Sequence, residues 1–431
     1  MTYFGTDGIR GIPNQELTID LMVRIGQALA IFKSPTICIA TDTRQSKDML
    51  VAGIVGGAMS KGLHVIYLGI LPTPALIYYA QVHQITGIMI TASHNPYGDN
   101  GIKILNRGRK LSLEEEGMLE IEIEKKQELD LTIGQIELCD GEKVYYEHIK
   151  SIFNKSNLKI AIDCANGATY HLAPMIFKQL ASEVIVVAAT PDGKNINKDC
   201  GSTHLELLQQ TVLNHHCDLG FAFDGDGDRV LCVDSTGRII TGDELIYVFA
   251  CYLKSKNRLY QNKVVLSKMS NLGILSALEQ QEIEVVLTEV GDKYISMVLN
   301  KQDLSLGGEN SGHIIIPHLF SSGDGILAAC FLLEVLTTTK ITLEQWLSNV
   351  LLCPEKTINI KANHKEQVIT DKRLKDTISN IKETTIPNGK IIVRVSGTED
   401  VIRLTVMDYQ KEQVKQAIAC ISEKIREIDY E

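Results

Sequence analysis

Three times along the chain, short β-branched apolar runs alternate with longer helix-like stretches in the order strand, helix, strand, helix, strand. The first runs of the three repeats begin at Thr36, Leu158 and Lys263. Helices that alternate with short apolar strands predict parallel strands joined by right-handed crossover connections. A recurrence at intervals of a little over a hundred residues therefore predicts three similar α/β domains with parallel or mixed sheets.

The tail of the chain, from about residue 355, follows a different pattern. Strand-like runs at Thr357–Lys361, Lys390–Val395 and Val401–Met407 are combined with helix-like stretches at Gln367–Lys382 and Lys411–Glu427. This combination predicts a smaller C-terminal α+β domain. We therefore expect four domains around a central cleft, and they cover residues 1–150, 151–250, 251–354 and 355–431.

Composition limits the partners that the chain can bind. Its 431 residues are 44% hydrophobic and 22% charged, which is typical of globular proteins rather than of disordered or fibrous ones. With 43 basic and 53 acidic residues the formal net charge is −10, and no dense basic tract occurs. Nucleic acid and anionic membrane surfaces are therefore not expected as partners.

The cysteines and the apolar segments bear on the compartment. Ten cysteines without a C-x-x-C pair disfavour both a zinc site and a secreted disulfide framework, so we expect reduced thiols. Asp7 and Arg10 interrupt the start of the chain, and the apolar stretch Tyr67–Val82 contains two prolines and is too short to cross a bilayer. These observations predict a cytoplasmic protein without a targeting or membrane-spanning segment.

Each of the three repeats ends its third strand in a polar cluster. The clusters are Thr91–Pro96 (TASHNP), Asp224–Arg229 (DGDGDR) and Gly308–His313 (GENSGH). Ligands of parallel α/β sheets bind beyond the carboxyl ends of the strands. We therefore expect the three clusters to line one cleft between the domains and to bind a small molecule there.

The second cluster predicts a metal site. Asp224, Asp226 and Asp228 place three carboxylates at alternate positions, separated by glycines that permit tight turns. Carboxylates this close repel one another unless a cation neutralises them, and hard oxygen ligands suit Mg²⁺ or Ca²⁺. We favour Mg²⁺ paired with a phosphate over a solvated Asp-Gly turn.

Residues near the clusters have two interpretations each. Ser93 is either a nucleophile or part of a turn, and Lys103 is either an acid or base beside the metal site or an ordinary surface lysine. The segment Arg394–Glu399, with Arg403 beyond it, fits both a plain hairpin and a phosphate clamp of guanidinium, hydroxyl and amide groups. Gly323–Ala328 matches a dinucleotide fingerprint but follows a third strand, so we interpret it as a helix start.

Five blocks together carry a resemblance to a known family. They are Phe4–Gly11 (FGTDGIRG), the three polar clusters and Arg394–Glu399 (RVSGTE), and they resemble the α-D-phosphohexomutase superfamily in order and spacing over essentially the whole chain. The resemblance implies a four-domain isomerase that transfers a phosphoryl group between two positions of a sugar. The opening block and Val290–Tyr294 (VGDKY) are most similar to the branch that interconverts glucosamine 6-phosphate and glucosamine 1-phosphate, on the route to UDP-N-acetylglucosamine.

The resemblance also implies a role for each matching residue. Ser93 would carry the transferable phosphoryl group, and together with Asp224, Asp226 and Asp228 it would hold Mg²⁺. The residues implied to surround the phosphoserine are Arg10, Lys103 and Arg229. The implied sugar contacts are Glu309 and Ser311, with His313 as a further acid/base candidate. The implied clamp for the non-reacting phosphate consists of Arg394, Ser396, Gly397, Thr398 and Arg403. A hexose or hexosamine 1,6-bisphosphate is the implied activator.

The sequence departs from that branch in several places. Asn310 stands where Gln is usual, and Lys293 stands where Arg is usual. Val395 stands where Lys or Pro is common, and Asp400 stands where Pro is common. Because Asn310 bears on the sugar, a phosphomannomutase or phosphoglucomutase is an alternative. An aspartyl sugar phosphatase with Asp224 as nucleophile and a non-catalytic binding protein are alternatives from other classes. The expected partners are small sugar phosphates, and a homodimer is compatible with the sequence.

Overall fold

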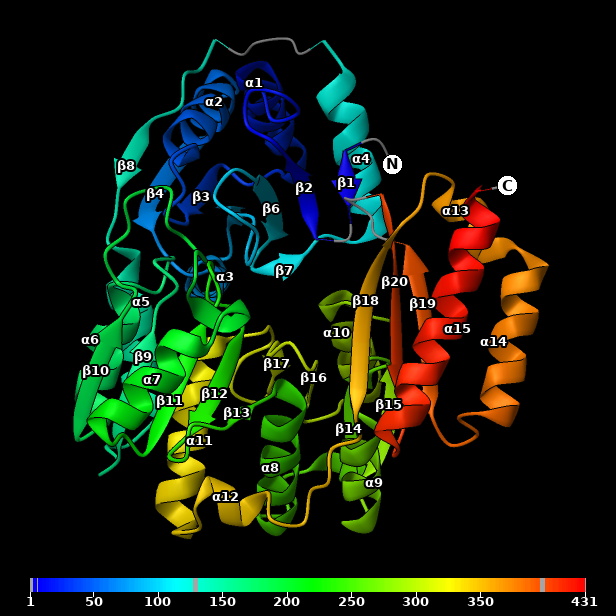
Figure 1. The fold of residues 1–431 in the computed structure, drawn as a ribbon. Coiled ribbons are helices and arrows are strands. Elements are labelled where there is room, and N and C mark those ends of the chain that lie inside the picture. The colour runs from blue at the N-terminus through cyan, green and yellow to red at the C-terminus, as the bar shows by residue number, and fades with distance from the viewer. Residues whose placement is uncertain (1–2, 6, 127–130, 396–399, 431) are drawn as a thin grey trace.

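The computed structural model describes residues 3–5, 7–126, 131–395 and 400–430. Four units follow one another along the chain and around the middle of the molecule (Figure 1). Each of the first three has a mixed sheet with helices on its faces, and the fourth is a smaller sheet covered by helices. The predicted fold class is confirmed, whereas the exact limits of the four domains stay a prediction.

The first unit contains an eight-stranded sheet of order β1-β2-β6-β5-β3-β4-β8, with β7 paired to β6. Strands β3, β4, β5 and β8 run parallel, and β1, β2, β6 and β7 pair antiparallel. Helices α1, α2 and α4 share a core with one face, and α3 packs on the other. The elements are β1 (Phe4–Gly5), β2 (Gly8–Gly11), α1 (Ile19–Ala28), β3 (Thr36–Thr41), α2 (Lys47–Ser60), β4 (His64–Ile70), α3 (Thr73–His83), β5 (Thr86–Ile90), β6 (Asn100–Asn106), β7 (Arg109–Lys110), α4 (Leu113–Glu124) and β8 (Ile136–Leu138).

The second unit contains a five-stranded sheet of order β10-β9-β11-β12-β13. Strands β10, β9 and β11 are parallel, and β12 and β13 are added antiparallel. The elements are α5 (Gly141–Ile152), β9 (Lys159–Asp163), α6 (Leu172–Leu180), β10 (Glu183–Val187), α7 (Glu206–His215), β11 (Leu219–Phe223), β12 (Val230–Asp234) and β13 (Ile239–Ile240).

The third unit contains a four-stranded sheet of order β15-β14-β16-β17. Its elements are α8 (Gly242–Ser255), β14 (Lys263–Ser267), α9 (Leu272–Gln280), β15 (Glu284–Thr288), α10 (Asp292–Gln302), β16 (Gly307–Gly308), β17 (Ile314–Ile315), α11 (Gly325–Thr339) and α12 (Leu343–Trp346). Helix α11 begins inside the segment that matches a dinucleotide fingerprint. Asp324 caps it by accepting a hydrogen bond from the Leu327 amide, so the interpretation of that segment as a helix start is confirmed.

The fourth unit contains a three-stranded antiparallel sheet of order β18-β20-β19 with its own apolar core. Its elements are β18 (Glu355–Lys361), α13 (Lys365–Thr370), α14 (Lys372–Thr384), β19 (Lys390–Val395), β20 (Val401–Met407) and α15 (Lys411–Tyr430). The stretch predicted as one helix over 367–382 is two helices, because Asp371 is extended and its side chain caps α14 through the Arg373 amide.

The largest apolar core runs without interruption through the first three units. It contains side chains of α3 and β5, of β9, β11 and α6, and of α8, β14 and α11. Helix α11 is buried almost all round, which explains its uniformly apolar sequence. A shared core fixes the first three units relative to one another, so loops that project from different sheets can build one precise site.

The polar clusters occupy corresponding places in the three units. In each unit the third strand of the repeat pairs antiparallel with the strand that follows it: β5 with β6, β11 with β12, and β16 with β17. Each cluster lies in the connection between these two strands, at the carboxyl end of the first. The chain thus places three polar loops at three equivalent sheet edges.

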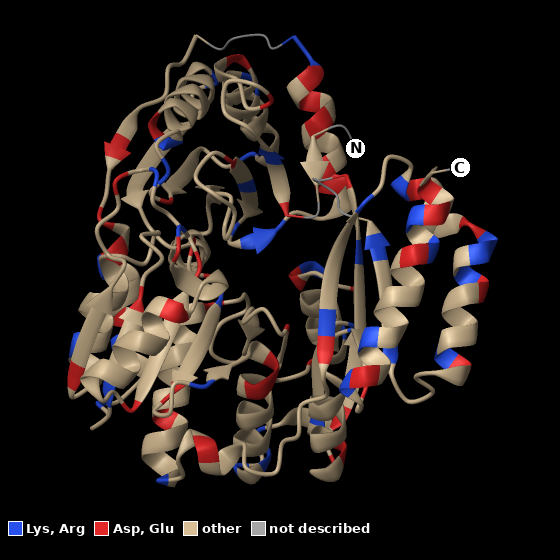
Figure 2. Ribbon diagram, viewed as in Figure 1, with Lys and Arg blue, Asp and Glu red and all other residues tan. Residues whose placement is uncertain are grey.

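Acidic and basic residues are mixed along the ribbon of all four units (Figure 2). The ten cysteines are unpaired thiols. Within the described ranges, no helix combines the length and the apolar character that crossing a membrane requires.

Candidate active site

The three polar loops meet where the first three units adjoin. The Ser93 hydroxyl donates to Asp224 Oδ2 at 2.6 Å, which joins the first loop to the second. His313 Nδ1 lies 3.8 Å from Asp228 Oδ2, which joins the third loop to the second. The predicted convergence of the three loops is therefore present in the structure.

Ser93 follows β5 in a backbone conformation that is unusual for a serine. Its φ is +52°, in the left-handed region, and its side chain is buried with only 3% exposed. Its amide donates to Thr91 Oγ1 at 2.9 Å. His94 Nδ1 lies 3.5 Å from Ser93 Oγ, and burial, followed by the charge of Arg229, lowers the pKa of His94 to about 4. The serine hydroxyl is thus held against the acidic loop beside a neutral imidazole.

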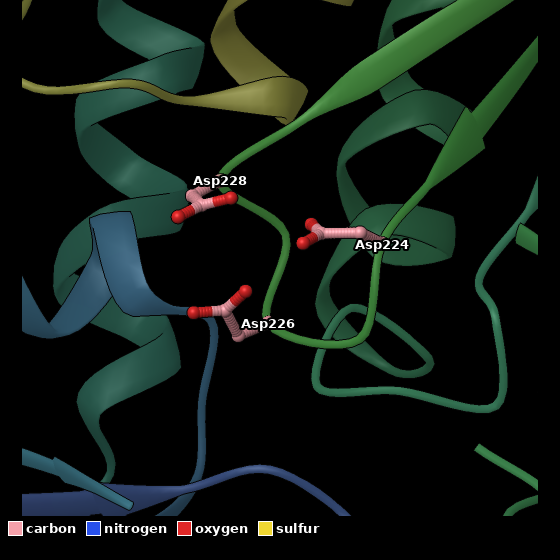
Figure 3. A group of neighbouring side chains, drawn as sticks. All are labelled: Asp224, Asp226 and Asp228. Atoms are coloured by element: carbon pink, nitrogen blue, oxygen red, sulfur yellow. The ribbon is translucent and has the colours of Figure 1, made fainter. Parts of the chain in front are cut away.

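The acidic loop after β11 points its three carboxylates toward one another (Figure 3). Asp224, Asp226 and Asp228 are buried, and one oxygen from each lies within 4.8 Å of the others. Asp226 Oδ2 accepts from Thr73 Oγ1 at 2.5 Å, but Oδ1 of Asp226 and Oδ1 of Asp228 are buried without a hydrogen-bond partner among the described residues. Orphaned anionic oxygens that face a common centre fit a hard divalent cation.

Electrostatics supports the same interpretation of the acidic loop. Burial, together with the charges of Asp228 and Asp226, holds the pKa of Asp224 well above its ordinary value. Burial also acts to raise the pKa of Asp228, but the charges of Lys103 and His313 outweigh it and hold that pKa well below the usual range. The ionised form of Asp224 is therefore favoured only when a further cation shares the space between the carboxylates.

Lys103, on β6, lies among three carboxylates. Its Nζ is 2.9 Å from Asp226, 3.0 Å from Asp7 and 3.4 Å from Asp228. Burial alone would lower the pKa of Lys103, but these charges outweigh burial and hold the pKa well above its ordinary value. Lys103 is not an ordinary surface lysine, because its side chain is buried in the acidic cluster.

Two arginines lie at the edge of the serine loop and the acidic loop. Arg10 Nη2 is 2.8 Å from Asp7, and the Arg229 amide donates to Asp224 at 3.2 Å while its Nε lies 3.7 Å from Asp228. Each guanidinium side chain remains about a quarter exposed, at 26% for Arg10 and 25% for Arg229. They are placed to meet an anion that enters from solvent.

The third loop contributes a carboxylate, a hydroxyl and an imidazole. Glu309 Oε1 accepts from the Gly291 amide at 2.9 Å. Ser311 Oγ is buried without a hydrogen-bond partner in the described parts of the chain. Burial would lower the pKa of His313, but Asp228 and Asp292 raise it above its ordinary value, and Asp292 lies 3.5 Å from Nε2.

The fourth unit presents two arginines side by side. Arg394 on β19 and Arg403 on β20 are direct partners in the antiparallel register. Burial, and then the charge of Arg403, lower the pKa of Arg394, while the charge of Glu309 acts in the opposite direction. Two cations in directly opposite positions repel, so an anion between them relieves the repulsion. Ser396, Gly397 and Thr398, the other predicted clamp residues, lie outside the described residues.

Several residues at the site were not predicted. Lys110 pairs with Asp7 at 3.1 Å and with Asp292, and so links the first unit to the third. Arg44 donates a hydrogen bond to the Ser93 carbonyl in the serine loop, and Thr73 donates one to Asp226 in the acidic loop. Arg44 follows the end of β3, the first strand of the first repeat. Site residues were sought only after the third strand of each repeat, and the same search after the first strands would have found Arg44.

Models of known families match all four units. They are described as phosphoglucomutase/phosphomannomutase α/β/α domain I over residues 1–130, domain II over 143–237, domain III over 241–351, and the C-terminal domain over 358–424.

Individual proteins agree with these matches. A phosphoglucosamine mutase of Caldicellulosiruptor bescii is 40% identical over 432 residues, which cover 96% of each chain. A solved phosphoglucomutase/phosphomannomutase family protein from Burkholderia thailandensis has a TM-score of 0.84 at 23% identity, covering 97% of this chain and 96% of its own. An N-acetylphosphoglucosamine mutase of Aspergillus fumigatus, solved with GlcNAc-6P and magnesium, has a TM-score of 0.73 at 15% identity, covering 100% of this chain and 96% of its own.

The two solved structures are similar to this chain in fold, whereas the bacterial relative is similar in sequence along nearly the whole length. The four family models together cover all five blocks that suggested the superfamily, and the bacterial relative bears the name of the branch that the opening block resembled. The chain belongs to the phosphoglucosamine mutase family of the α-D-phosphohexomutases.

Proposed function

We propose that this protein interconverts glucosamine 6-phosphate and glucosamine 1-phosphate, with Ser93 as the phosphoryl carrier and a sugar 1,6-bisphosphate as intermediate and activator. The observation that carries the proposal is the contact of Ser93 Oγ with Asp224 at 2.6 Å, next to the buried acidic cluster. A hydroxyl that is buried at the junction of three units, against a cation site, is placed to hold a phosphoryl group.

Asp224, Asp226 and Asp228 are the residues that would hold Mg²⁺, together with the phosphoryl group on Ser93. The orphaned oxygens of Asp226 and Asp228 and the raised pKa of Asp224 fit such an ion. When bound, Mg²⁺ supplies charge neutralisation to the transferring phosphoryl group.

The reaction has two phosphoryl transfers. In the first, the free hydroxyl oxygen of the sugar attacks the phosphorus on Ser93, the bond from phosphorus to Oγ breaks, and its electron pair stays on Oγ. The hydroxyl proton passes to a base. His313 and Lys103 are the acid/base candidates by position, and the carboxylates that raise the pKa of both suit them better to the acid that returns a proton than to the base. In the second, Ser93 Oγ attacks the other phosphate of the bisphosphate, and the released sugar oxygen takes a proton back.

The sugar must turn over between the two transfers. Each end of the bisphosphate then visits Ser93 while the other end is held elsewhere. Arg394 and Arg403, with the predicted clamp segment, are suited to hold that other phosphate, because guanidinium groups recognise a phosphate on either end of the sugar. Glu309 and Ser311 would contact sugar hydroxyls between the two phosphates.

Sugar preference tests the proposal. The purified protein, given Mg²⁺ and a bisphosphate activator, should show its highest kcat/KM with glucosamine 6-phosphate rather than with glucose 6-phosphate or mannose 6-phosphate. A clear preference for glucose or mannose would favour the phosphoglucomutase or phosphomannomutase alternative, to which the departure at Asn310 points. A cytoplasmic location and a homodimer stay predictions from the sequence.

A further inference from the structure

Two buried side chains from different units donate hydrogen bonds to the same pair of main-chain carbonyls in the loop that carries Ser93. Arg44 Nη2, in the first unit, lies 3.0 Å from the Ser93 oxygen and 2.8 Å from the Asn95 oxygen. Asn197 Nδ2, in the second unit, lies 2.8 Å and 3.0 Å from the same two oxygens. The serine loop is thus held from both sides of a unit boundary.

The Arg44 guanidinium uses its N–H donors on Asp42 and on the main chain of this loop. Its Nε donates to Asp42 Oδ2 at 2.9 Å, its Nη1 to the carbonyls of Asp99, at 3.0 Å, and of Pro96, and its Nη2 to the two carbonyls above. All five N–H donors of the guanidinium therefore have partners. The side chain is completely buried, and its charge is balanced by Asp42. A lysine could keep the ion pair but could not bond four carbonyls.

Asn197 and the acidic loop reach the serine carbonyl from the second unit. Asn197 has a φ of +58°, and its amide is fixed by the Ala165 carbonyl at 2.9 Å. A Cβ added at Gly225, between the first two aspartates, would collide with the Ser93 carbonyl oxygen and approach Asn197 Nδ2 to 2.8 Å. The absence of a side chain at Gly225 therefore lets the acidic loop touch the serine loop at the carbonyl that Asn197 and Arg44 bind.

This arrangement controls where the serine oxygen lies. Ser93 is in the left-handed region, which its own side chain does not favour, so neighbouring groups must hold it there. Phosphoryl transfer needs the attacking and leaving oxygens in line, and a misplacement of about 1 Å can cost about 100-fold in rate. Holding these two main-chain carbonyls fixes the peptide plane that follows Ser93 and the one that follows Asn95, and so restrains the direction of the serine side chain.

We propose that Arg44 and Asn197 are positioning residues that lock the Ser93 main chain to the acidic loop, so that Oγ stays in line with the phosphorus during both transfers. The inference rests on the proposed role of Ser93 as the phosphoryl carrier. It predicts that loosening the lock slows transfer from the phosphoserine without weakening the binding of the sugar phosphate.

Asn197→Gly tests the lock, because glycine accepts a positive φ and the change removes the side chain whose Nδ2 binds both carbonyls. The matched control is Asn257→Gly, which removes an exposed asparagine of φ +54° that contacts none of the site loops. Each protein is phosphorylated on Ser93 with radiolabelled glucose 1,6-bisphosphate, freed of excess label, and mixed with increasing glucosamine 6-phosphate in a single turnover. The first-order rate of label transfer to the sugar counts only phosphorylated molecules, so an unfolded fraction does not alter it.

We expect the maximal transfer rate of Asn197→Gly to fall about 10- to 100-fold, with an unchanged half-saturating sugar concentration and with the control at the wild-type rate. Arg44→Lys should show the same split. Asn197→Asp is the second variant, for use if the glycine variant does not fold, because aspartate is isosteric and also tolerates a positive φ. It places a carboxylate against the two carbonyls, so it should slow transfer at least as much.

Wild-type transfer rates in the Asn197 and Arg44 variants would overturn the proposal. So would an equal fall in Asn257→Gly, because that outcome would assign the effect to general loosening of the fold. Ser93→Ala separates the two levels of inference: if it still takes up label and turns over, the proposed carrier is wrong; if it is inactive while the lock variants behave as wild type, only the lock is wrong.

Discussion

Asp226 divides its carboxylate between two tasks. Oδ2 accepts from Thr73 and Lys103, whereas Oδ1 is buried and has no partner among the described residues. The first oxygen fixes the acidic loop to the first unit, and the second is available to a cation. A single residue thus joins the structure of the loop to its proposed chemistry.

Replacing Asp226 with Asn should weaken Mg²⁺ binding. The change removes one anion of three and sets an amide against Lys103, so we expect the affinity to fall at least about tenfold, or about 1.4 kcal/mol. Isothermal titration of EDTA-treated protein measures this directly. Asp234→Asn is the matched control, because Asp234 is buried in the same unit and its Oδ1 accepts hydrogen bonds that an amide oxygen also accepts. Equal affinities in both variants would exclude Asp226 as a ligand.

At the scale of elements, the pairing of β19 with β20 makes Arg394 and Arg403 direct neighbours. Arg394→Ala should remove a charged hydrogen-bonding partner of phosphate, worth about 1.5–3 kcal/mol, or about 10- to 150-fold in kcat/KM. Because the proposed clamp would serve both orientations of the bisphosphate, and because the equilibrium is fixed, the loss should be equal in the forward and reverse directions. Arg373→Ala, on α14 in the same unit, is the control. No defect in either direction would leave β19 and β20 as a plain hairpin.

The start of α8 predicts a pH effect on stability. Asp243 is fully buried and accepts from Ser270 Oγ at 2.9 Å and from the Asn271 amide at 2.8 Å, and burial raises its pKa to about 6. Between about pH 4 and pH 6 the folded protein holds this proton more tightly than the unfolded chain, so the free energy of unfolding falls as the pH rises, by up to about 3 kcal/mol.

The Asp243→Asn variant has no carboxyl proton to lose, and its side-chain amide can still form hydrogen bonds with Ser270 and Asn271. The thermal midpoint of the wild type should therefore decline relative to that of the variant as the pH increases from about 4 to 6, and the difference should level off above that. Parallel pH curves for the two proteins would show that Asp243 titrates in the folded state as it does in the unfolded chain.

Elements with a strong pattern were predictable. The runs near Thr36, Leu158 and Lys263 became β3, β9 and β14, since β-branched apolar residues between turn signals have few alternatives in an α/β chain. The return strands β6 and β12 were not predicted as strands, because their pairing depends on the loop before them and not on an apolar period. The polar clusters were predicted because ligands of parallel α/β sheets bind beyond the carboxyl ends of the strands.

At the scale of the whole molecule, the site depends on contacts between units. The pairs that join Lys103 to Asp226, Lys110 to Asp292 and His313 to Asp228 connect segments more than 80 residues apart. Periodicity shows which residues face a core, but it does not show which loops of different sheets meet. The resemblance to a family supplied the grouping of residues, and the structure added Arg44, Asn197 and Lys110, which no motif had indicated.

Transfer of label from phosphoserine to sugar tests the central claim most directly. Wild-type protein labelled with glucose 1,6-bisphosphate and then given glucosamine 6-phosphate should pass the label to the sugar as a bisphosphate, and mass analysis should place the phosphate on Ser93. Ser93→Ala should fold, take up no label and lose mutase activity, because a methyl group cannot carry the phosphoryl group. Label released as inorganic phosphate, or full activity in Ser93→Ala, would contradict the account and favour a phosphatase with Asp224 as nucleophile.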